Sequence, residues 1–138
     1  MKSLVAFIAL AVLVSAASQD SCADTPATAE TAALAWLALV DAGNYAKSWN
    51  TAAAYFRNAV PQAQWVSQVA AVRGPLGAVK SRRLSSSQLT HSLPGAPDGE
   101  YTVIHFTTSF EQKTDATETV TPMKDPDGHW RVSGYYIR

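Results

Sequence analysis

The stretch EYTVIHFTTSFEQKTDATETVTPMKDPDGHWRVSGYYIR, residues 100–138, decides the fold. It is rich in β-branched and aromatic residues, and its first part alternates in side-chain type with a period of two. Turn-forming residues at 113–115 and 125–128 divide it into segments. The stretch therefore predicts a three-stranded β-meander on which the rest of the chain packs.

The first predicted strand, Glu100–Gln112, has two different faces. The face with the largest apolar groups is expected to point to the core and comprises Thr102, Ile104, Phe106, Thr108 and Phe110. The opposite face comprises Tyr101, Val103, His105, Thr107 and Ser109. In the last strand Gly134 is a candidate β-bulge, so the sequence leaves open which of Tyr135 and Tyr136 points inward.

A polar segment, Ala78–Leu93, precedes the meander and is separated from it by the turn-rich segment Pro94–Gly99. We interpret this segment as a strand at the edge of the sheet. Its adjacent basic residues, Arg82 and Arg83, would point to opposite faces of the strand. We therefore interpret them as solvated edge charges that block pairing with other chains, in preference to a site for an anionic ligand.

Three helices are predicted before the sheet. The first begins at Thr25-Pro26, a good cap followed by a good first helical residue, and ends near Gly43. Apolar residues at three- and four-residue spacing predict a second helix over Asn44–Val60. Pro61 closes this helix or opens the third, which Gly74-Pro75 is expected to end.

Helices followed by an antiparallel sheet predict a single α+β domain at residues 25–138. The helices would pack on one face of a curved sheet of about four strands. Aromatic residues at helical spacing are expected to belong to the core, and the alternative is that they line an apolar ligand pocket. The residues of this candidate pocket are Trp36, Tyr45, Trp49, Phe56, Trp65, His105, Trp130 and Tyr135.

The N-terminus has the pattern of a secretory signal peptide. Lys2 is followed by an apolar run, Leu4–Val14, that is short for a membrane span, and then by small residues. Cleavage is expected after Ala17, which gives a signal peptide of residues 1–17, and cleavage after Ala23 is the alternative. The mature protein would then be periplasmic or secreted, without a stable membrane span. It would start with a flexible tail at 18–24.

The sequence predicts no cofactor, no metal and no assembled catalytic set. The single cysteine, Cys22, allows no internal disulfide, and the chain has no phosphate loop, dinucleotide fingerprint or nucleophile elbow. The three histidines, His91, His105 and His129, fall in separate segments without metal-ligand spacing. One acid–base arrangement stays open, in which His105 lies opposite Glu118 across a hairpin.

Several motifs spread over most of the chain carry a resemblance. They are WLALVDAGNY at 36–45, PLG at 75–77, LPGAPDGEY at 93–101, ETVTP at 118–122 and WRVSGY at 130–135. The chain resembles a family of small secreted bacterial domains of unknown function, number forty-nineteen. The order of helices and strands also resembles, more weakly, the nuclear-transport-factor-like and cystatin-like α+β folds. The resemblance implies a secreted domain and leaves its activity open.

The sequence thus favours a non-enzymatic module that binds a protein partner or a small apolar ligand. Two alternatives remain: a pocket-based hydrolase or isomerase that uses His105, and a structural envelope protein that assembles through its sheet edge. The balance of 11 basic and 11 acidic side chains gives no basic surface for nucleic acid.

Overall fold

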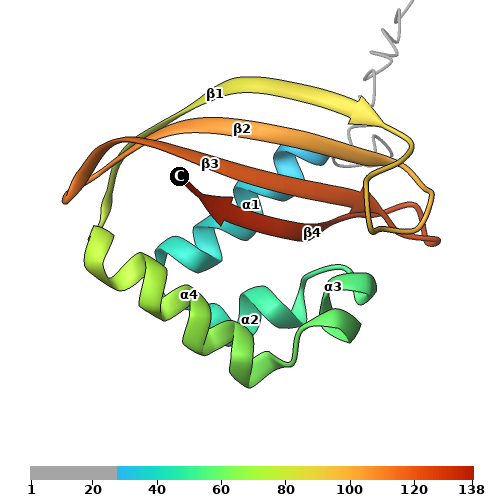
Figure 1. Ribbon diagram of the computed structural model, residues 1–138, viewed down its shortest axis with the longest axis horizontal. Helices are drawn as coiled ribbons and strands as arrows, with labels where there is room; N and C mark the ends of the chain where they lie inside the picture. The colour runs from blue at the N-terminus through green and yellow to red at the C-terminus, as the bar shows by residue number, and fades with distance from the viewer. Residues whose placement is uncertain (1–27) are drawn as a thin grey trace, which may run out of the picture.

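The computed structural model describes residues 28–138, in which four helices precede four strands (Figure 1). The helices are α1 (Ala29–Asp41), α2 (Tyr45–Asn50), α3 (Ala54–Ala59) and α4 (Gln62–Leu76). The strands are β1 (Val79–Thr90), β2 (Tyr101–Phe110), β3 (Lys113–Lys124) and β4 (Trp130–Ile137). This confirms the predicted α+β fold. The predicted signal peptide, residues 1–17, the tail at 18–24 and the cap at Thr25 lie outside the described residues.

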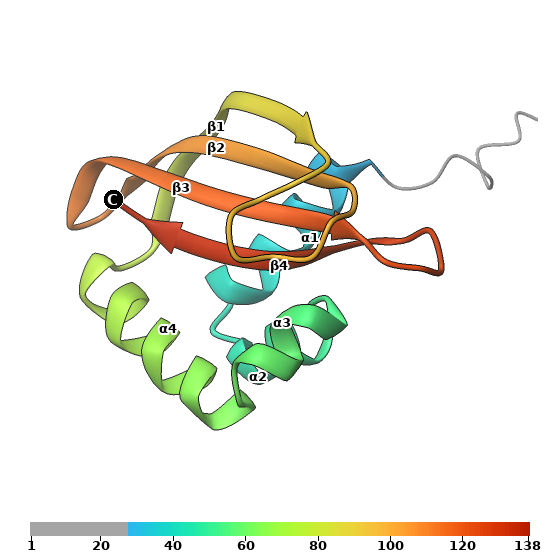
Figure 2. The same ribbon diagram turned by 45° about the vertical axis from the view of Figure 1, so that its right-hand side comes forward.

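The strands form one antiparallel sheet in the order β1-β2-β3-β4. Figures 1 and 2 show the helices gathered on one face of the curved sheet, with α1 beneath the strands and α4 beyond the edge of β4. The core lies between these layers, and Ile104 and Phe106 of β2 belong to the same buried cluster as Trp36 and Leu37 of α1. No described helix is long and apolar enough to cross a membrane.

The two faces of β2 are those that its alternation predicts. Ile104, Phe106, Thr108 and Phe110 are buried, whereas the residues between them are half-buried. The even-numbered face points to the helices, and His105 therefore lies on the outer face of the sheet.

A β-bulge in β4 settles which of the two tyrosines points inward. Thr121 pairs with Gly134, but Pro122 pairs with Val132, so Ser133 is the extra residue beside the predicted position. Tyr135 consequently turns toward the helices, where it packs against the core. Tyr136 points outward and is 51% exposed.

The helices differ from the prediction at their boundaries. Thr28 caps α1 by accepting a hydrogen bond from the Thr31 amide at 3.1 Å. The predicted second helix is broken in two, since the amide of Ala53 donates to the Val132 carbonyl of β4 at 2.8 Å. A continuous helix would use this amide for its own ladder, so a contact with the sheet overrides local helix propensity.

The third predicted helix runs past Gly74-Pro75 and ends at Leu76. Because Pro75 has no backbone N–H, the last turn of the helix lacks one hydrogen bond, and this costs little stability so near the end. The helix ends instead at Gly77, whose φ of +74° is a backbone conformation that favours glycine.

Candidate functional site

An apolar groove of about 500 Å³ lies between α4 and β4. It is lined by Trp65, Gln68, Val69, Ala71, Val72, Tyr135, Tyr136 and Ile137. Val72 on one wall is 50% exposed and Tyr136 on the other is 51% exposed. Large apolar side chains on both walls therefore face the solvent, which is typical of a surface that contacts a ligand or partner.

The floor of the groove is a packed aromatic cluster. The ring of Tyr135 lies edge-on to that of Trp36, with a centroid distance of 5.2 Å, and 6.5 Å from that of Trp65. The indole of Trp65 donates a hydrogen bond to the Ser48 hydroxyl at 2.9 Å, and that of Trp36 donates to the Ser48 carbonyl at 2.8 Å. Because these indole N–H groups have buried partners, the rings are held in fixed positions.

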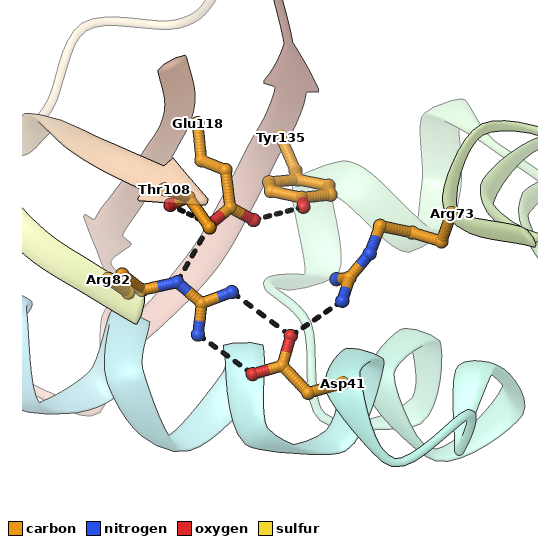
Figure 3. Close-up of polar contacts among 6 residues, drawn as sticks. All are labelled: Asp41, Arg73, Arg82, Thr108, Glu118 and Tyr135. Atoms are coloured by element: carbon orange, nitrogen blue, oxygen red, sulfur yellow. Dashed lines mark hydrogen bonds and ion pairs between the residues drawn. The ribbon is translucent and has the colours of Figure 1, made fainter. Parts of the chain in front are cut away.

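Beneath the groove, Glu118 of β3 is fully buried and accepts three hydrogen bonds (Figure 3). Arg82 Nε donates to Oε1 at 2.7 Å, and the Thr108 hydroxyl donates to the same oxygen at 2.5 Å. The hydroxyl of Tyr135 donates to Oε2. Burial and the neighbouring carboxylate raise the pKa of Tyr135 well above its ordinary value. The phenol is thereby kept neutral, as a donor.

Asp41, the last residue of α1, extends the contacts of Glu118 into an ion network of Asp41, Arg73, Arg82 and Glu118. It accepts two hydrogen bonds from Arg82, at 2.7 and 3.0 Å, and one from Arg73 at 2.8 Å. Burial would raise the pKa of Asp41, but the bonds from both arginines outweigh it and lower the pKa. Asp41 and Glu118 thus balance the charges of Arg73 and Arg82, which lets these groups lie beneath the groove.

Arg73 of α4 is the less exposed of the two arginines, with 4% of its side chain exposed against 12% for Arg82. Its guanidinium lies 5.0 Å from the ring centroid of Phe110, within reach of a cation–π contact. Its Nε and Nη1 atoms are buried and make no hydrogen bond within residues 28–138. The aromatic face therefore compensates part of the charge where hydrogen bonds are missing.

Comparison with family models gives one match over residues 32–135, to a family described as protein of unknown function (DUF4019). The chain belongs to this family. The DUF4019 match includes all six residues of Figure 3, from Asp41 to Tyr135. Comparisons with curated proteins and with solved structures found no match. The weaker resemblance to nuclear-transport-factor-like and cystatin-like folds is not confirmed.

The residues of the candidate pocket do not lie around one cavity of this DUF4019 domain. Trp65 and Tyr135 line the α4–β4 groove, whereas Trp36 and Trp130 line a smaller groove of about 350 Å³ between α1 and β4. The others that pack in or against the hydrophobic core are Tyr45, Trp49 and Phe56. The groove thus combines two of the expected aromatic residues with aliphatic residues of α4.

The structure does not form the acid–base pair of His105 and Glu118. His105 pairs with Thr119 and shares a hydrogen bond with its hydroxyl at 3.0 Å, whereas Glu118 pairs with Phe106. Directly paired residues point to the same side of a sheet, so His105 lies on the outer face and Glu118 on the helix face. The DUF4019 domain therefore separates the two groups by the thickness of the sheet.

The interpretation of Arg82 as a solvated edge charge is wrong. Its side chain is 12% exposed and bridges Asp41 and Glu118, while its neighbour Arg83 lies on the outer face. The signal that the sequence analysis missed is the alternation of side chains along β1. Arg82 pairs with Thr108, so its side chain points to the same core face as that of Thr108. An acid at Glu118 on the same face of β3 requires a nearby cation.

Proposed function

We propose that this protein is a non-enzymatic binding module that holds apolar groups of a ligand or partner in the α4–β4 groove. The single observation that carries this proposal is the apolar groove between α4 and β4, whose lining includes the half-exposed Val72 and Tyr136. Burial of such surface contributes roughly 25 cal/mol per Å², so even partial coverage of both walls favours binding.

The chemistry of the lining favours binding over catalysis. Within the described part of the chain, the residues around the groove include no aspartate, glutamate, histidine, lysine or arginine. The nearest carboxylate, that of Glu118, is used by three hydrogen bonds beneath the floor. A ligand in the groove would therefore meet mainly apolar surface and the amide of Gln68, without a free acid or base.

We further propose that the module works in the periplasm or outside the cell after removal of residues 1–17. The apolar run Leu4–Val14 and the small residues up to Ala17 support this. Fractionation of expressing cells, followed by mass determination of the exported protein, tests the proposal. A mature protein that begins at Ser18 supports it, and an unprocessed chain in the cytoplasm would contradict it.

The binding proposal is tested with the apolar fluorescent dye 1-anilinonaphthalene-8-sulfonate. We expect the folded protein to bind the dye, and Val72→Glu to weaken this binding about tenfold, because it places on the groove wall a negative charge that repels the sulfonate of the dye. Leu89→Glu is the matched control, because Leu89 is 56% exposed and lies on β1, away from the groove. Equal binding by both variants, or no binding by the wild type, would contradict the proposal.

A further inference from the structure

The free edge of β4 presents backbone groups to the groove. Thr117 and Arg138 exchange two hydrogen bonds, of 2.9 and 3.0 Å, at the end of the β3–β4 ladder. The register from there to Gly134 is regular, since Glu118 pairs with Ile137 and Val120 with Tyr135. In an antiparallel ladder such bonded pairs alternate with non-bonded ones. The amides and carbonyls of Tyr135 and Ile137 therefore point away from β3.

Within the described residues, these outward groups have no backbone partner. Further along the same edge the carbonyl of Val132 is taken by the amide of Ala53 at 2.8 Å. The chain thus covers one end of the edge and leaves the other end free. Tyr135 and Ile137 are also groove residues, and both ribbon views show α4 beyond the edge of β4 (Figures 1 and 2).

We propose that the groove binds an extended peptide segment of a partner protein, which adds to the sheet as a strand beside β4. This inference rests on the proposed function and names the occupant of the same groove. The amides and carbonyls of Tyr135 and Ile137 pair with the backbone of the peptide. Alternate side chains of the peptide then point toward α4, where they cover Val69 and Val72.

The charges near the groove select the chemistry of the peptide. Neither α4 nor β4 contains an aspartate or glutamate, and the guanidinium of Arg138 lies 5.9 Å from the ring centroid of Tyr136 beside the free edge. The peptide therefore carries apolar residues at alternate positions and an acidic residue that reaches Arg138. A second copy of this chain would bring two basic edges together, so it is the poorer occupant.

The opposite edge of the sheet differs in this respect. The exposed strand β1 carries Lys80 and Arg83 and has few apolar residues. Charged residues of this kind protect an edge from pairing. The free end of β4 has an apolar groove beside it instead, and this combination gives backbone pairing a specific partner surface.

The test starts with selection of linear random peptides on the purified protein, followed by competition with the dye. We expect selected peptides to show apolar residues at alternate positions with an acid at one end, and to displace the dye. Hydrogen exchange followed by NMR should show that peptide binding protects the amides of Tyr135 and Ile137. Tyr136 is the internal control, because its amide already faces β3.

Ile137→Pro removes the outward amide without removing a bond of the β3 ladder. We expect it to weaken peptide binding by about tenfold or more, whereas Ile137→Ala, which keeps the amide, should weaken it only a few fold. Both variants shorten the same groove side chain, so dye binding should fall by a similar factor in the two. Dye binding without any competing peptide, or peptides that leave both amides unprotected, would overturn the strand addition and leave the proposed function standing. Loss of dye binding in the wild type would overturn both. A dimer that protects these amides without peptide would identify a second copy as the occupant and overturn the peptide partner.

Discussion

The hydroxyl of Tyr135 donates a hydrogen bond to the fully buried carboxylate of Glu118, so the floor of the groove and the ion network share one contact. The ring side of Tyr135 lines the groove, and its hydroxyl end belongs to the network. The position of a groove residue is thus fixed by charges that no ligand in the groove would touch.

Tyr135→Phe should lower the free energy of unfolding by about 2 kcal/mol, because it removes a hydrogen bond to a charged group and leaves an oxygen of Glu118 unpaired. Denaturation in urea measures this. Tyr136→Phe is the matched control, since Tyr136 is exposed, and its effect should stay within about 0.5 kcal/mol. Equal effects of the two substitutions would show that the Tyr135 hydroxyl contributes nothing.

Glu118→Gln should destabilise the fold by about 3–5 kcal/mol. The substitution keeps the size of the side chain but leaves Arg82 with a buried charge that Asp41 alone must balance. Glu100→Gln provides the comparison, because its ion pair with Lys124, at 3.4 Å, is exposed and should contribute at most about 1 kcal/mol. A small loss for Glu118→Gln, similar to that of Glu100→Gln, would contradict the structural importance of the network.

The stability of the protein should depend on acid pH through Asp41. Its pKa in the folded state is lowered below the ordinary value of 3.8, so the folded state binds the proton less readily than the unfolded state. The contribution of Asp41 is therefore complete above that value and is lost as the pH falls through the lower, folded-state pKa.

In urea denaturation at several pH values, the wild type should exceed Asp41→Asn by a constant free energy above about pH 5. The difference should shrink as the pH falls below about 4, because the wild type then loses the charge that the variant lacks. A difference that stays constant or grows in acid would show that Asp41 does not titrate with a lowered pKa.

Gly77→Ala should destabilise the protein, because Gly77 has a φ of +74° and an added Cβ would lie 3.0 Å from Cβ of Glu111. We expect a loss of about 1–2 kcal/mol in thermal or chemical unfolding. Gly74→Ala is the contrasting change, because Gly74 lies within α4 with nothing within 4 Å of an added Cβ. It should change the free energy of unfolding by less than about 1 kcal/mol, because the steric restriction by Pro75 on a preceding residue with a Cβ opposes the gain in helix propensity. Similar effects of both changes would exclude a backbone requirement at Gly77.

The fold was predictable where the sequence carries a local period. The alternation of β2 identified the buried face, and turn residues located the connections of the sheet. The break between α2 and α3 was not predictable in this way. It depends on the bond from Ala53 to Val132, which joins residues far apart in the sequence. The orientation of Tyr135 likewise depends on the extra residue of a bulge.

The candidate site was predictable only in part, for a related reason. The aromatic residues of the helices were expected to belong to the core, and a pocket that includes Trp65 and Tyr135 was the alternative. In the structure both residues pack in the core and also line the groove. The ion network escaped prediction, since Arg82 lies in a polar segment whose composition is typical of a solvated strand. Its burial follows from pairing with β2 and from acids on α1 and β3, which only the folded chain brings together.

The ion network also bears on how long the folded protein persists. Asp41 meets Arg73 and Arg82 across 32 and 41 residues of sequence, and Arg82 meets Glu118 across 36. Closing such long loops costs chain entropy, and we expect the side chains of the network to reach their final positions only after the strands have paired. Interactions formed that late slow unfolding and hardly accelerate folding. We therefore expect the network mainly to lower the unfolding rate, which lengthens the lifetime of the native state in the presence of proteases.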